Sequence, residues 1–127
     1  MPDKHLYEYA VIRFVPRVER EEFINVGLIL FSKQARFIQA RYLLDEAKLR
    51  LFSSEPDLST LRTHLDLFDT ICRGKPEGGP VAAFDIPERF RWLTAVRSAS
   101  IQTSRPHAGL TSDLKATFEK LFDELVR

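Results

Sequence analysis

Three segments near the start of the chain show the apolar patterns of β-strands. Leu6 to Val15 alternates with largely apolar side chains on both faces, which is typical of a strand covered on both sides. Phe23 to Phe31 is a short run of branched and aromatic residues, in which Gly27 predicts a bulge or a close approach of another backbone. Arg36 to Leu43 follows after the tight return at 33–35. Three strands with short connections predict an antiparallel meander.

From Asp45 onward the apolar residues recur at helical spacing. Asp45 is placed to cap a short helix that runs through residue 52, and Asp57 to cap a longer helix that ends at Cys72. Gly74 stands where a helix-terminating glycine belongs, and Gly74 to Pro80 is the clearest loop of the chain. These residues therefore predict two helices followed by a turn-rich connection.

Two further helices are separated by a polar stretch. Pro87 suits the first turn of the third helix. The fourth helix is predicted to be capped by Thr111 or Ser112, with Asp113 at the positive end of its dipole. Between these helices Ser98 to Thr103 predicts a strand, and the residues after it a loop. The predicted fold is α+β: a small antiparallel sheet, made of the N-terminal three-stranded meander and one later strand, packed against about four helices.

Length and composition limit the class of protein. A chain of 127 residues predicts a single domain over 1–127 with a sizeable core. A net charge of +1 argues against a broad nucleic-acid binder, which usually shows a basic excess. The single cysteine, Cys72, allows no internal disulfide and fits a reducing compartment. Because the sequence shows neither a signal core nor a membrane-spanning run, we expect a cytoplasmic protein that makes no contact with membranes.

His107 is the candidate for acid–base chemistry, because the ordinary pKa of histidine lies near neutrality. In a catalytic site it would act on Ser98, Ser100 or Ser104 as nucleophile, or be oriented by Asp113. The alternative is a loop histidine that caps the next helix or bonds a backbone carbonyl. No G-x-S-x-G motif and no complete catalytic set is present, which disfavours an enzyme.

Arginine residues on several predicted strands raise the possibility of an anion pocket. Arginine presents a rigid fork that fits phosphate and carboxylate. Arg13, Arg41 and Arg97 would hold the anion if they converge, with Ser98 or Gln102 orienting the ligand and His107 transferring a proton. Such a site predicts that these side chains line one cleft.

The alternative for these arginines is structural. Arg13 interrupts an otherwise apolar face, and a buried arginine must be paired. Ion pairs from Arg13 or Arg41 to Glu8, Glu22 or Asp45 would satisfy that requirement without any ligand.

Other polar and aromatic residues also have two interpretations. Trp92 could stack on a base, but we predict that it belongs to the core. Asn25 and Gln102 could bond a ligand or satisfy backbone groups beside a bulge. The three histidines lack metal-binding spacing, and no glycine-rich nucleotide loop is present, so we expect neither a metal nor a cofactor.

Three stretches carry a resemblance to a known family. They are "YEYAVIRFVP", "EEFINVGLILF" and "RFRWLTAVRSASIQTSRPHAGLT", and together they resemble the bacterial DUF3037 family over nearly the whole chain. The resemblance implies a small bacterial protein of unknown function. Because some members are encoded near a HipA-like kinase domain, it also implies a role as a partner.

These observations lead to two hypotheses for the function. The first is a non-catalytic interaction or regulatory module for a protein encoded nearby, with a HipA-like kinase as a candidate partner. It predicts an exposed apolar or aromatic patch, or an unpaired sheet edge, that a partner or a second copy covers. The second is a small enzyme or binding domain for an anionic ligand, either a phosphate or a nucleic acid.

Overall fold

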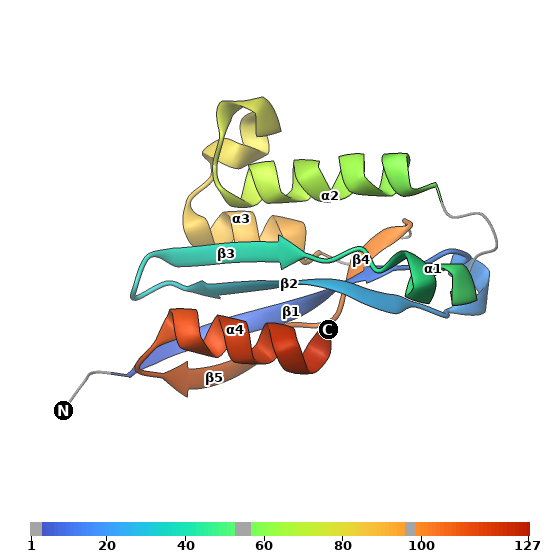
Figure 1. The fold of residues 1–127 in the computed structure, drawn as a ribbon. Helices are drawn as coiled ribbons and strands as arrows, with labels where there is room; N and C mark the ends of the chain where they lie inside the picture. Colours follow the sequence, from blue (N-terminus) through green and yellow to red (C-terminus); the bar gives the residue numbers. More distant parts are fainter. Residues whose placement is uncertain (1–3, 53–56, 96–98) are drawn as a thin grey trace.

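The middle layer of the protein is an antiparallel β-sheet of five strands (Figure 1). The computed structural model describes residues 4–52, 57–95 and 99–127. The strands run in the order β3-β2-β1, and the two short strands β4 and β5 both pair with β1. Their bounds are β1 His5–Phe14, β2 Ile24–Ser32, β3 Phe37–Tyr42, β4 Ile101–Thr103 and β5 His107–Thr111.

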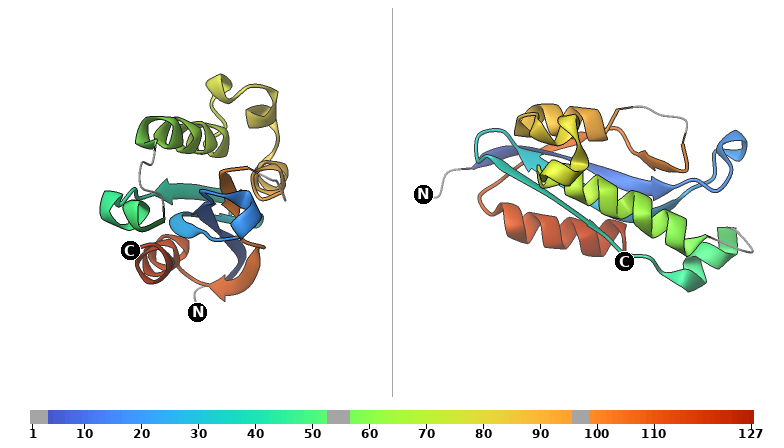
Figure 2. Two further views of the ribbon diagram at one scale, coloured as in Figure 1. Left: turned by 90° about the vertical axis from the view of Figure 1, so that its right-hand side faces the viewer. Right: turned by 90° about the horizontal axis from the view of Figure 1, so that it is seen from above.

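Helices cover both faces of this sheet. Figure 2 shows α2 and α3 on one face and α4 on the other. An aspartate side chain caps α2, α3 and α4, in each case by accepting a hydrogen bond from a backbone N–H in the first turn. No helix in the described part of the chain combines the length and apolar content needed to cross a bilayer. The helices are α1 Glu46–Phe52, α2 Leu58–Cys72, α3 Ile86–Leu93 and α4 Leu114–Leu125, with short 3-10 turns at Val18–Arg20, Pro76–Gly78 and Pro80–Ala83.

The alternation of side chains along the strands divides the core into two layers. The larger layer lies between the sheet and α1, α2 and α3, and it contains Ile12, Ile29, Leu65, Phe90 and the single cysteine, Cys72. The smaller layer lies under α4 and is built from Leu28, Leu30, Leu114, Phe118, Phe122 and Val126. Arg13 and Arg41 occupy strand positions that face α4.

The structure confirms the predicted α+β fold and the N-terminal meander. It also confirms the two expectations for Gly27. The pairing of β1 with β2 shifts register at Ile12/Arg13, which leaves Val26 as the extra residue of a bulge beside Gly27. A Cβ atom on Gly27 would lie 2.7 Å from the carbonyl oxygen of Arg41. Only glycine therefore allows β3 to approach this closely.

Three local predictions are wrong. His107–Thr111 was expected in a loop but forms β5, because its backbone pairs with the first half of β1. The side chain that caps α4 is Asp113, rather than that of Thr111 or Ser112. Trp92 was expected in the core, but it is 37% exposed. Of the strand predicted over 98–103, residues 101–103 form β4, and Ser98 lies outside the described residues.

Candidate functional site

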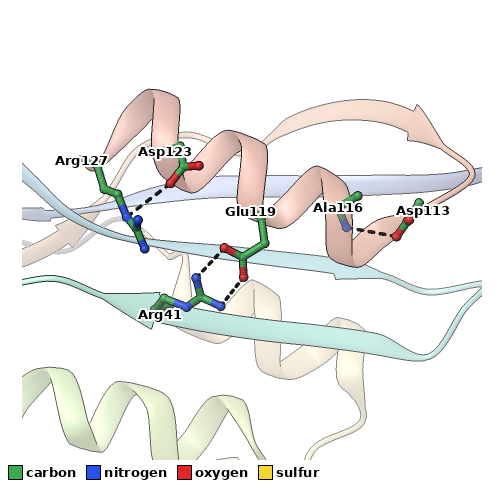
Figure 3. A network of polar contacts seen from close by, with 6 residues as sticks. All are labelled: Arg41, Asp113, Ala116, Glu119, Asp123 and Arg127. Carbon is green, nitrogen blue, oxygen red and sulfur yellow. Dashed lines mark hydrogen bonds and ion pairs between the residues drawn. The ribbon is translucent and has the colours of Figure 1, made fainter.

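Arg41 is held in an ion pair with α4. Its Nη1 and Nη2 atoms donate to the two carboxylate oxygens of Glu119 at 2.8 and 2.5 Å (Figure 3). This two-point hydrogen bond raises the pKa of Arg41 and lowers that of Glu119. The guanidinium also lies 5.2 Å from the ring centre of Phe118. Arg41 therefore has its own counter-ion and fixes β3 to α4.

The ion pairs predicted for Arg13 and Arg41 do not form, because each proposed acid has another partner. Glu8 accepts two hydrogen bonds from Arg91 of α3, at 2.9 and 2.6 Å. Glu22 binds Arg20 at 2.5 Å within the β1–β2 connection. Asp45 accepts a hydrogen bond at 3.2 Å from the backbone N–H of Lys48 in the first turn of α1. The actual partner of Arg41 comes from α4, far along the chain.

Arg13 has no carboxylate partner among the described residues. Its guanidinium carbon lies 3.9 Å from the ring centre of Phe23, a cation–π contact. Burial lowers the pKa of Arg13. Its Nε atom is buried without a hydrogen-bond partner, and so is Oδ1 of Asn25, the residue opposite Arg13 on β2. This pair of unsatisfied atoms is separate from Arg41, and Arg97 lies outside the described residues.

Two of the groups proposed to work with His107, Ser104 and Asp113, are engaged elsewhere. His107 lies on the exposed strand β5, with its ring 5.3 Å from that of Tyr9. The hydroxyl of the buried Ser104 accepts a hydrogen bond from the N–H of Val11 at 2.9 Å. The carboxylate of Asp113 caps α4 (Figure 3). Within the described residues the structure therefore joins His107 to neither of these two groups, and Ser98 lies outside them.

A groove of about 190 Å³ opens between α2, α3 and β4. Its inner surface includes the buried side chains of Phe68, Ile71 and Leu93. Two large apolar side chains remain exposed at the groove, Leu67 at 49% and Trp92 at 37%. The other lining residues are His64, Ala95, Ala99, Ser100, Ile101, Gln102 and Thr103. The groove thus has the apolar lining of a site for an apolar side chain.

The polar side chains of β4 are tied back to the protein. Gln102, which was a candidate ligand contact, donates from Nε2 to the carbonyl oxygen of Ala99 at 2.8 Å. The hydroxyl of Thr103 donates to the carbonyl oxygen of Thr94 at 3.4 Å. In the part of the chain that the structure describes, no three His, Cys, Asp or Glu side chains gather where they could hold a metal ion.

Sequence reasoning missed the groove, although one signal was present. The apolar stripe of the predicted helix 57–72 accounts for Leu61, Leu65 and Phe68, but it leaves Leu67 outside. A leucine off the buried stripe of an amphipathic helix either meets solvent or meets a partner. The position of Leu67 therefore pointed to this surface.

Both edges of the sheet are unpaired within the described residues. β3 pairs only with β2, and β5 pairs only with β1. On β5 the side chain of Leu110 is 64% exposed, and its neighbour on β1, Leu6, is 53% exposed. Leu6 also borders a hollow of about 420 Å³ beside the ion pair of Glu8 and Arg91. These edges provide the second kind of surface that the interaction hypothesis predicts.

Comparison with known proteins gives one match. The sequence profile of DUF3037, described as a protein of unknown function, matches residues 9–126. No curated protein and no solved structure matches the chain. The matched residues include every strand and helix described above, apart from the first four residues of β1. The chain therefore belongs to the DUF3037 family.

Proposed function

We propose that this protein is a non-catalytic interaction module that binds an apolar side chain of a partner protein in the groove between α2, α3 and β4. The observation that carries the proposal is the exposure of Leu67 and Trp92 beside the buried side chains of Phe68, Ile71 and Leu93. Tryptophan is one of the residues enriched among binding hot spots, and it buries a large apolar area.

The surroundings of the groove favour binding over chemistry. The side chains of Gln102 and Thr103 donate to backbone carbonyl oxygens of Ala99 and Thr94. Ser104 and Asp113, two of the groups considered with His107, stabilise the fold rather than face a common cleft. An apolar surface with internally satisfied polar groups suits a partner that contributes apolar area.

The partner that we propose is a protein encoded near this one. A HipA-like kinase is the first candidate, because the family resemblance points to it. Binding would cover Leu67 and Trp92 and leave the opposite face of the sheet free.

The experiment uses Trp92, which is the single tryptophan, as a reporter. The protein is mixed with each purified operon neighbour, and tryptophan emission and isothermal calorimetry are recorded. A true partner should move the emission to the blue. Leu67→Ala should weaken binding about tenfold or more, because burial of a leucine contributes about 1.5–3 kcal/mol.

Leu51→Ala is the matched control. Leu51 lies on α1, is 83% exposed and does not line the groove. It should leave the affinity unchanged. The proposal fails if a neighbour binds without changing the emission, if Leu67→Ala and Leu51→Ala behave alike, or if none of the neighbours binds.

A further inference from the structure

The hydrogen bonds of β1 show which backbone groups of β5 are free. The N–H of Leu6 points away from β5, because it donates to Oε1 of Gln34 beside the β2–β3 turn at 3.3 Å. The N–H of Val11 points to the opposite side of β1, where it donates to the hydroxyl of Ser104. Backbone groups alternate in direction along a strand, so Tyr7 directs its N–H and C=O groups toward β5.

The same alternation applies to β5, which borders the sheet (Figure 1). Gly109 is the register partner of Tyr7, so its backbone groups are bonded to β1. Its neighbours Ala108 and Leu110 therefore turn their N–H and C=O groups away from β1. Both residues are exposed, and no other strand of the described residues pairs with this edge. These backbone groups are open to a further strand.

The free groups match those of a second copy of the same strand. When two β5 strands run antiparallel about a twofold axis at Gly109, Ala108 of each copy falls opposite Leu110 of the other. Because these are the residues with free groups, each such pair can exchange two hydrogen bonds. The pairing also sets a small side chain against a large one. At the axis Gly109 meets its own copy in a closely spaced pair, and the missing side chains allow this approach.

The residues that flank β5 carry opposite charges at matching positions. In the same register Arg105, before the strand, falls opposite Asp113 of the other copy, after the strand. Arg105 is exposed and has no acidic partner in the part of the chain that the structure describes. Asp113 caps α4 through Oδ1, and its other carboxylate oxygen makes no hydrogen bond there. Every contact of this pairing occurs twice, as a twofold interface requires.

The side chains of β5 favour pairing at this edge. The strand carries no Asp, Glu, Lys or Arg, although charges are a usual means by which an edge strand avoids association. Leu110 is 64% exposed beside Leu6 at 53%, and Ala108 of the second copy would extend this apolar patch across the axis. Pro106 has no N–H to donate, so the ladder ends there. A short ladder with a small apolar patch predicts a dimer of low affinity.

We propose that two copies of this protein associate through β5, antiparallel about Gly109, so that their sheets join into one continuous sheet. No residue of β5 lines the groove between α2, α3 and β4, so the dimer leaves that groove free. The partner in this interface is the chain itself, and the interface does not depend on the proposed function.

The test begins with sedimentation equilibrium of the full chain up to about 1 mM, where an interaction of millimolar affinity is substantially formed. The average mass should rise toward that of a dimer as the concentration increases. Amide hydrogen exchange is then compared between dilute and concentrated samples. The amides of Ala108 and Leu110 should exchange more slowly in the concentrated sample, whereas that of Gly109, already bonded to β1, should change little.

Leu110→Lys places a charge at the centre of the interface on a side chain that the monomer leaves exposed. It should weaken dimerisation about tenfold or more, because the dimer loses the burial of a leucine on each side of the axis. Leu51→Lys is the matched control, since Leu51 is 83% exposed on α1, and it should leave the dimer unchanged.

The register is tested through the charges at the two ends of the ladder. Arg105→Gln and Asp113→Asn should each weaken the dimer about two- to tenfold, the range for two exposed ion pairs. Asparagine caps a helix as well as aspartate does, so the second variant keeps α4 intact. The double variant should be no weaker than either single one, because both remove the same pair.

The proposal is overturned if the protein stays monomeric up to about 1 mM, or if the two lysine variants behave alike. It is also overturned if Ala108 and Leu110 exchange at the same rate in dilute and concentrated samples, or if the effects of the two charge variants multiply. Leu67→Ala should dimerise like the native protein. A dimer that is lost in Leu67→Ala forms through the groove and would exclude the pairing through β5.

Discussion

Ser104→Ala tests how β4 and β5 are joined along one side of β1. At the break between the two strands, the backbone N–H of Ser104 donates to the carbonyl oxygen of Val11 at 2.8 Å. Its hydroxyl accepts from the N–H of Val11 at 2.9 Å and donates to the carbonyl oxygen of Arg105 at 3.1 Å. The side chain thus replaces a backbone acceptor where the ladder is interrupted.

The size of the effect follows from burial. Val11 and Ser104 are both buried, so water cannot take the place of the lost hydroxyl. A buried donor left without an acceptor costs about 1–3 kcal/mol. For a chain of this length that loss corresponds to a fall of roughly 4–12 °C in the melting temperature.

Urea unfolding and amide hydrogen exchange measure this prediction. Ser104→Ala should lower the urea midpoint without changing the slope, and the amide of Val11 should exchange faster relative to that of Ile12. Ser112→Ala removes the same atom from an exposed position and should change the stability by less than about 0.5 kcal/mol. If the two variants unfold at the same midpoint and the exchange of Val11 is unaltered, the hydroxyl does not stabilise the strand junction.

Three further outcomes are expected. Gly109→Ala places a Cβ atom against the ring of Tyr7 and should lower the free energy of unfolding, measured in urea, by about 1–3 kcal/mol. Adding Tyr7→Leu should recover part of that loss, and an unchanged urea midpoint for Gly109→Ala would rule out the overlap. Because Arg41 lowers the pKa of Glu119, their pair stabilises the native state above the unfolded-state pKa and is lost as pH falls through the folded-state pKa. Glu119→Gln should therefore be less stable than the native protein near neutral pH and equal to it in strong acid; a difference that persists in acid would contradict this. Burial raises the pKa of Cys72 to about 12, so a thiol reagent should label the native protein only at its rate of unfolding, and labelling as fast as in urea would refute the assignment.

Local patterns were sufficient for most of the fold. The strands over 5–14, 24–32 and 37–42 and the four helices carry their periodicity in their own residues, so the sequence alone predicts them. β5 could not be predicted in this way, because "HAGLT" has one β-branched residue and a glycine in its middle. It forms a strand because its backbone pairs with residues 5–9 of β1, whose N–H and C=O groups on that side have no other strand to pair with among the described residues. Those residues lie about a hundred positions earlier in the chain, so the local sequence of β5 does not reveal the pairing.

The candidate site was harder to predict, because its contacts join distant segments. Arg41 was rightly expected to require an acid, but its partner, Glu119, is 78 residues away, and the nearby acids bind other groups. Trp92 was expected in the core because a tryptophan usually is, yet the packing of α3 leaves it at the rim of the groove. Residue type predicted the kinds of contact, and only the packing of the helices on the sheet determined the pairs.

The position of β1 between β2 and the strands β4 and β5 has a consequence for the nascent chain. The hairpin with β2 can form early in synthesis, whereas the other side of β1 is paired by residues 101–111, which leave the ribosome much later. Contacts that span most of a polypeptide form slowly, and a strand that waits for them exposes its edge to neighbouring molecules. Chains that stop before residue 101 should therefore aggregate, and chaperones should recognise this protein chiefly before translation reaches its last helix.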